Sequence, residues 1–231
     1  MFQENAAQCV DLAIQYKLRA VSYGRGPDKK TIARFKEAGV LCIPTVGALK
    51  HAQKAIEMGA NVVTIQGGEG GGHTGSVPTT VLLPQVVDAV RVPVVAAGGF
   101  YDGRGLVAAL AFGAQGIAMG TRFLMTSDSG VPAATLERYL QVRDAEKIQV
   151  SFLVDGMPQR MIPNEYLTML EKASPLKRLR IALDLALRWK AQTGMTTTHA
   201  LKVLWQGLRE DTSSVAQTVM ASSAPMLLQR S

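Results

Sequence analysis

The amino-acid sequence predicts an α/β fold built on a parallel sheet, and two observations support this prediction. Short apolar strand candidates alternate with segments of helical period from residue 1 to about residue 126. Such alternation is typical of α/β folds. The strand candidates are continuous apolar runs rather than alternating ones, as expected for a parallel sheet that is covered on both faces.

Each expected strand is followed by a break and then a helix. The strands are expected at residues 19–23, 40–47, 61–66, 92–99 and 116–124, with their ends near Tyr23, Val46, Gln66, Ala97 and Met119. Helical spacing of apolar residues predicts helices at residues 5–17, 29–39, 49–60, 81–90 and 103–114. Gly39 and Gly59 are expected to stop the second and third helices, since glycine is common directly after a helix.

The number of strands limits the possible architectures. A closed (β/α)8 barrel needs eight strands and typically about 250 residues, whereas this chain shows about five strand signals in 231 residues. The core is therefore either an open sheet or a partial barrel that lacks three N-terminal units. We expect this core to cover residues 1–126 and a mainly helical extension to cover residues 127–231. Helices are predicted there at residues 134–147, 164–172 and 176–192, with strand propensity at residues 150–156.

Composition excludes several classes of protein. With 47% hydrophobic and 19% charged residues, the chain is not intrinsically disordered. The formal net charge is +7, and basic residues gather between Lys172 and Lys190. A solvated helix face explains this cluster better than a binding surface does. We expect no nucleic-acid partner, because the aromatic stacking surface of a single-strand binder is missing.

Cellular location and cysteine chemistry follow from simple signals. Cys9 and Cys42 do not form a CxxC motif, and both are expected to be small buried hydrophobes in a reducing compartment. The sequence shows no secretory signal and no apolar run of about 18 residues. We therefore expect a cytoplasmic protein with no membrane partner.

The loop after the third strand, QGGEGGGHTG from Gln66, is the most informative segment. Glycine allows positive φ angles and lets a ligand approach the backbone closely. Ligands of α/β folds bind at the carboxyl ends of the strands, which is where this loop lies. His73 stands among residues without bulk, and its ordinary pKa of about 6.5 allows it to accept a proton at neutral pH. His51 and His199 fall in helical patterns and are interpreted as structural. No metal site is expected, because His73 has no second ligand at a suitable spacing.

The ends of the last two strands also carry glycines. Gly98 and Gly99 follow the fourth strand, and Gly120 and Thr121 follow the fifth. If these are the last two strands of a barrel, their loops form a phosphate cradle. Asp102 is expected to cap the helix that begins near Gly103.

Together, the segments QGGEGGGHTG, LLPQVVDAV and VPVVAAGGFYDGRGLVAALAFGAQGIAMGTRFL resemble the nitronate monooxygenase family, formerly the 2-nitropropane dioxygenases. The resemblance implies an FMN-dependent TIM-barrel oxidoreductase, here a partial barrel. It also implies that His73 is the catalytic base. The residues expected to bind FMN are Gln66, Gly71, Gly98, Gly99, Met119, Gly120 and Thr121.

Three functional hypotheses remain open. The first is oxidation of a nitronate or nitroalkane with O2, with His73 as the base. The second is an FMN enzyme of the same fold, reduced by NAD(P)H, that acts on an enoyl- or hydroxyacyl-CoA thioester, as in a branch of the family similar to steroid-ring degradation enzymes. The third is an inactive truncated fragment. Its exposed edge strand would allow pairing with another chain, and a homodimer is one such assembly.

Overall fold

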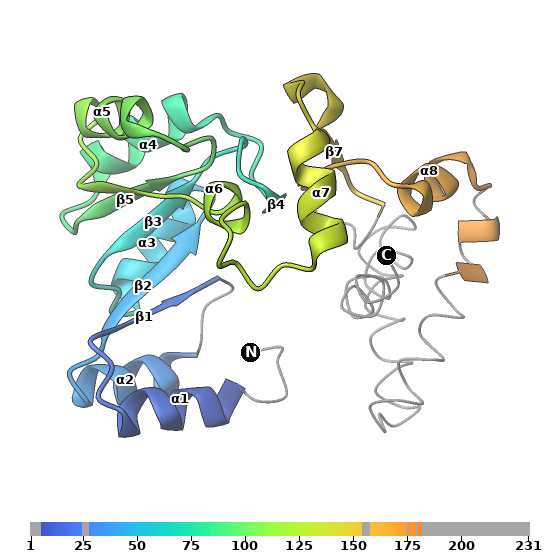
Figure 1. The fold of residues 1–231 in the computed structure, drawn as a ribbon. Coiled ribbons are helices and arrows are strands. Elements are labelled where there is room, and N and C mark those ends of the chain that lie inside the picture. Colours follow the sequence, from blue (N-terminus) through green and yellow to red (C-terminus); the bar gives the residue numbers. More distant parts are fainter. Residues whose placement is uncertain (1–5, 25–27, 154–157, 175, 179, 182–231) are drawn as a thin grey trace. The chain divides into compact units, whose positions relative to one another are not determined.

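The computed structural model describes residues 6–24, 28–153, 158–174, 176–178 and 180–181 (Figure 1). The chain divides into two compact units, Met1–Arg138 and Tyr139–Ser231. The described part of the first unit contains a parallel sheet with helices packed on it. The described part of the second contains an antiparallel strand pair and a helix.

The sheet of the first unit has five strands, and all of its neighbouring strands are parallel: β1 (Ala20–Tyr23), β2 (Leu41–Val46), β3 (Val63–Gln66), β5 (Val94–Ala97) and β6 (Gly116–Ala118). Their order in the sheet is their order in the chain. Parallel neighbours need crossover connections, and the helices supply them. The curled sheet with its helices is part of a (β/α)8 barrel, as expected (Figure 1).

Five helices cover this sheet: α1 (Ala6–Gln15), α2 (Lys29–Glu37), α3 (Leu49–Glu57), α4 (Thr79–Ala89) and α5 (Gly103–Ala111). Gly39 and Gly59 follow α2 and α3 with φ angles of 71° and 111°, so both predicted stops are confirmed. Asp102 caps α5, because its carboxylate accepts hydrogen bonds from the amides of Arg104 and Gly105. This prediction is also confirmed.

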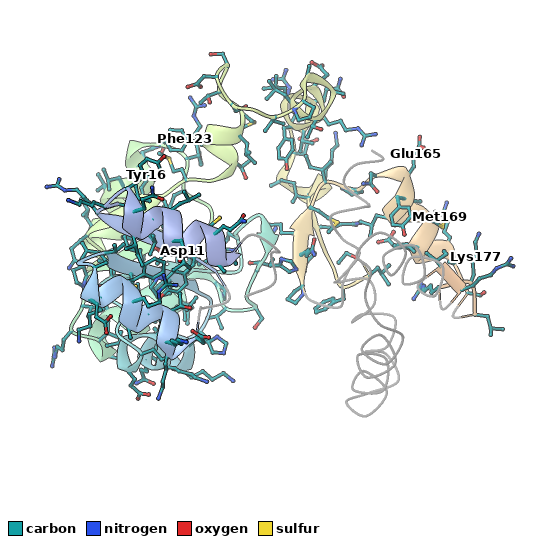
Figure 2. The ribbon with its side chains drawn as sticks, turned by 90° about the horizontal axis from the view of Figure 1, so that it is seen from below. Asp11, Tyr16, Phe123, Glu165, Met169 and Lys177 are labelled. Atoms are coloured by element: carbon teal, nitrogen blue, oxygen red, sulfur yellow. The ribbon has the colours of Figure 1, made fainter. Side chains whose placement is uncertain are left out.

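Two apolar clusters hold the helices on the sheet. The larger joins α4 to β3 and β5, and its fully buried side chains include Val63, Ile65, Leu82, Leu83 and Val86. The smaller contains residues of α1, α2 and β2. The guanidinium of Arg34 on α2 donates to the carboxylate of Asp11 on α1, at 2.6 Å between Nη2 and Oδ1. Asp11 is labelled on α1 in Figure 2.

The structure corrects two sequence predictions. Cys42 is buried, but Cys9 is exposed, because Val10 and Ala13 form the buried face of α1 and Cys9 lies off it. Within the stretch expected to be a strand at residues 116–124, β6 ends at Ala118, one residue before the end predicted near Met119. Residues Thr121–Leu124 form the short helix α6 instead. The amides of Phe123 and Leu124 donate to the carbonyl of Gly120, which turns the chain away from the sheet.

Helix α7 (Ala133–Gln141) runs across the boundary between the two units. The second unit then contains the 3-10 helix η1 (Ala145–Lys147) and the antiparallel strands β7 (Gln149–Ser151) and β8 (Gln159–Met161). Its helix α8 (Glu165–Lys172) is capped by the side chain of Asn164 and buries Leu167 and Leu170. Most of the helix expected at residues 176–192 lies outside the described residues, as do Arg188 and Lys190 of the basic cluster. Among the residues that are described, no helix is long and apolar enough to cross a bilayer.

Candidate active site at the carboxyl edge of the sheet

The register of the sheet brings the loops with functional candidates to one edge. Gln66, the last residue of β3, pairs in register with Ala97, and Ala97 pairs with Ala118. The three loops that follow these residues therefore start side by side. An ideal Cβ built on Gly71 would lie 3.4 Å from Thr121 Oγ1, so the first and last of these loops approach each other closely.

The glycine-rich loop that carries His73 is held by hydrogen bonds and is not a loose linker. The side-chain amide of Gln66 donates to the carbonyl of His73 at 2.6 Å. The hydroxyl of Thr74 donates to the carbonyl of Gly67 at 3.0 Å. Within the loop, the Gly70 amide donates to the same carbonyl at 3.1 Å. Gln66, which was expected to contact FMN, thus also orders the loop backbone around His73.

His73 lies in the two-residue strand β4 (Gly72–His73) and is exposed. Gly72 has a φ of 71°, a conformation that side chains rarely adopt, so the backbone directly before His73 requires glycine. His51 lies in α3 and is exposed, and His199 lies outside the described residues. His73 is thus the histidine that the described structure places at this edge.

The turn after β5 needs its glycines for its own shape. Gly98 and Gly99 have φ angles of 96° and 82°. An added Cβ on Gly98 would come within 3.0 Å of the amide nitrogen of Gly70, and one on Gly99 within 3.2 Å of Glu69 Cβ. This turn is therefore packed against the glycine-rich loop, and its glycines are explained without a ligand.

Gly120 differs, because nothing in the described part of the chain requires glycine there. Its φ is −90°, which any residue adopts, and no atom lies within 4 Å of an ideal Cβ. Gly120 is the N-cap of α6, and no side chain caps that helix. Exposed backbone N–H groups at such a position suit an anion, and the lack of a side chain leaves room for it. The residues around Gly120 and Thr121 therefore fit a phosphate group.

The neighbouring helix α5 is a poorer place for an anion. Asp102 occupies its N-terminus, and the guanidinium of Arg104 donates to the same carboxylate, at 2.6 Å between Nη2 and Oδ2. This hydrogen bond is the main reason why the pKa of Asp102 lies below its ordinary value. A phosphate placed there would meet a carboxylate that is ionised at neutral pH.

Sequence reasoning missed one contact at this edge. Glu69 Oε2 accepts hydrogen bonds from the amide and the hydroxyl of Thr79, at 3.0 Å and 2.7 Å. The available signal was the proline at position 78, since a proline N-cap has no side chain that can accept from the first turn of α4. An acceptor from elsewhere in the chain is then expected.

Comparisons with known proteins identify the family to which the chain belongs. A family model described as nitronate monooxygenase matches residues 2–222. A Rhodococcus jostii protein named (3aS,4S,5R,7aS)-5-hydroxy-7a-methyl-1-oxo-octahydro-1H-indene-4-carboxyl-CoA dehydrogenase is 47% identical over 97% of this chain and 63% of its own length. The chain thus spans less than two thirds of that relative.

Solved structures show the same fold. A FabK variant from Thermotoga maritima has a TM-score of 0.68 and 34% identity, and the match covers 74% of this chain and 56% of FabK. A nitroalkane oxidase from Streptomyces ansochromogenes has a TM-score of 0.63 and 33% identity, covering 69% of this chain and 49% of the oxidase. The fold, the glycine-rich edge and the family match together show that the chain belongs to the nitronate monooxygenase family of flavin-dependent oxidoreductases.

Proposed function

We propose that this chain forms the phosphate-binding and proton-abstracting part of an FMN-dependent dehydrogenase that acts on a ring-bearing carboxyl-CoA thioester. The observation that carries the proposal is the meeting, at one sheet edge, of the His73 loop with the open backbone at Gly120 and Thr121. The CoA thioester is favoured over other substrates because the Rhodococcus protein is named as a carboxyl-CoA dehydrogenase.

The proposal assigns the following roles to individual residues. Backbone amides near Gly120 and Thr121 would hold the FMN phosphate, with Gly71, Gly98, Gly99 and Met119 lining the approach and Gln66 ordering the loop. The bound flavin would accept electrons from the substrate. His73 would take the proton from the carbon next to the thioester carbonyl, which stabilises the negative charge left behind. A positioned base of this kind typically contributes about 10²–10⁴-fold.

Nitroalkane oxidation is the second candidate. A nitro group acidifies the neighbouring carbon as a thioester does, so the same base would serve both substrates. The family match and the likeness to a nitroalkane oxidase support it. NAD(P)H-dependent reduction of an enoyl-CoA is the reverse reaction, in which the same residues would act in the opposite direction. Anaerobic consumption of NAD(P)H with an enoyl-CoA would distinguish that direction from dehydrogenation.

The test replaces His73 with asparagine, which keeps a polar group but removes the base. Exchange of the thioester α-proton with D2O, followed by NMR, should slow by about 10²–10⁴-fold. His51→Asn is the matched control, since His51 is also exposed but lies on α3. For the nitro substrate, turnover of neutral nitroethane should fall by the same order, whereas turnover of the pre-ionised nitronate should fall much less. Equal losses for both forms would show that His73 is not a base.

A further inference from the structure

The start of helix α4 depends on a residue from the glycine-rich loop. Thr79 is the first residue of α4 and is 5% exposed. Its amide and its hydroxyl both donate to Glu69 Oε2, ten residues earlier in the chain. A carboxylate at the N-terminus of a helix is stabilised by the helix dipole, and hydrogen bonds to a charged acceptor are stronger than neutral ones. Glu69 is therefore firmly attached to α4.

The same two residues also contact the turn after β5. An added Cβ on Gly99 would lie 3.2 Å from Glu69 Cβ, so the Glu69 side chain lies directly on this turn. Thr79 Oγ1 is 3.3 Å from the carbonyl oxygen of Gly98. A hydroxyl has one hydrogen to donate, and the shorter distance to the carboxylate, 2.7 Å, indicates that Glu69 receives it. Glu69 and Thr79 thus lie where the His73 loop, the Gly98–Gly99 turn and α4 meet.

We propose that Glu69 and Thr79 are positioning residues that fix the His73 loop relative to the phosphate-binding edge. Three residues separate Glu69 from His73, and all three are glycine, so this segment has no side chains of its own with which to pack. The Glu69 carboxylate attaches the loop to the rigid α4 and keeps it against the turn. This inference rests on the proposed role of His73 as a base.

The first measurement is amide hydrogen exchange in the flavin-free chain, which does not depend on catalysis. In Glu69→Ala and in Thr79→Val, exchange of the Gly68, Gly70 and Thr79 amides should become about 10–100-fold faster, as expected for loss of charge-assisted hydrogen bonds. Thr79→Ser keeps both donors and should restore near-normal exchange. Asp102→Ala is the matched control, because Asp102 caps α5 at the same edge. Asp102→Ala should leave the exchange rates of these three amides unchanged.

The second measurement follows proton abstraction in the flavin-bound protein. Thioester α-proton exchange should slow by about 10-fold or more in Glu69→Ala and in Thr79→Val. The rate constant at saturating substrate should fall by this factor, whereas KM should change little. The double variant should be no slower than the worse single variant, since each residue acts through the other. If Glu69→Ala does not fold, Glu69→Gln takes its place, because it keeps the shape and loses only the charge.

The outcomes separate the two proposals. Unchanged amide exchange in Glu69→Ala and Thr79→Val would overturn the proposal that these two residues hold the His73 loop on α4. A second outcome assumes that His73→Asn abolishes proton abstraction. If the Glu69 and Thr79 variants then show faster amide exchange but normal proton abstraction, the two residues only stabilise the loop, and the positioning role is overturned. If His73→Asn has no effect on proton abstraction, the proposed function fails. The inference that Glu69 and Thr79 position a base then fails as well. Amide exchange still reports whether these two residues hold the loop.

Discussion

The substitution Gly120→Leu tests the phosphate site most directly, because an ideal Cβ at position 120 contacts none of the described residues. Gly120 is exposed, its φ is −90°, and an ideal Cβ there meets no described atom within 4 Å, so we expect the flavin-free chain to accept leucine at this position. We expect its free energy of unfolding to change by no more than about 1 kcal/mol, with a small gain from the restricted unfolded chain. A loss of flavin binding then cannot be attributed to misfolding.

The expected loss of affinity follows from the amides that the leucine side chain would cover. A hydrogen bond from an N–H group to a charged oxygen contributes about 1.5–3 kcal/mol. Losing two such bonds, near Gly120 and Thr121, would raise the dissociation constant of FMN by about 10²–10⁴-fold, since each 1.4 kcal/mol is tenfold. Titration of the flavin-free protein with FMN, followed by flavin fluorescence, measures this change.

Two controls make the result specific. Gly116→Leu places the same side chain at the opposite end of β6, where an added Cβ also meets nothing within 4 Å, and should leave FMN affinity unchanged. Riboflavin, which has no phosphate, should bind the Gly120→Leu variant as it binds the original chain. Unchanged FMN affinity, or an equal loss for riboflavin, would refute the assignment of the phosphate to this loop.

Three further predictions concern stability and reactivity. Because the pKa of Asp102 is lowered in the folded protein, the ionised carboxylate stabilises the fold at pH values above the ordinary pKa of 3.8. This stabilisation is lost as the pH falls below 3.8 and the carboxylate is protonated. Asp102→Asn should therefore lower the melting temperature at pH 7 but not at strongly acidic pH, and an equal loss at both would contradict this. Leu83→Ala should reduce the free energy of unfolding by about 2–5 kcal/mol in chemical denaturation, because Leu83 is fully buried, and a loss below 1 kcal/mol would contradict the assigned core. A thiol reagent should modify exposed Cys9 within the folded protein, whereas Cys42, whose pKa is raised by burial, should react only on unfolding. Equal rates in the folded state would contradict this assignment.

Local sequence signals predicted the strand ends well. The strands that end at Tyr23, Val46, Gln66 and Ala97 do so at the predicted residues, because each is an apolar run that stops at a glycine or at a glycine-rich break. The fifth strand was overestimated, since the apolar residues of α6 continue the same pattern past Gly120. A run of apolar residues does not distinguish a strand from a short helix, and the hydrogen bonds to the Gly120 carbonyl decide between them.

The glycine-rich loops were visible in the sequence, but the reasons for their glycines were not. Gly98, Gly99 and Gly120 look alike as letters. The structure separates them, since the first two are required by positive φ and close packing, whereas the third is open. Only the third therefore has no explanation in the packing of the described residues.

By itself, the sequence determined the α/β class, the alternation of elements and the candidate base, because these depend on local composition and period. The tertiary structure decided which loops meet, since the register of Gln66 with Ala97 and Ala118 depends on pairing between distant segments. It also decided the role of Glu69. The sequence around Glu69 does not show which group its carboxylate binds, and the hydrogen bonds to Thr79 form because the folded sheet places the loop at the start of α4.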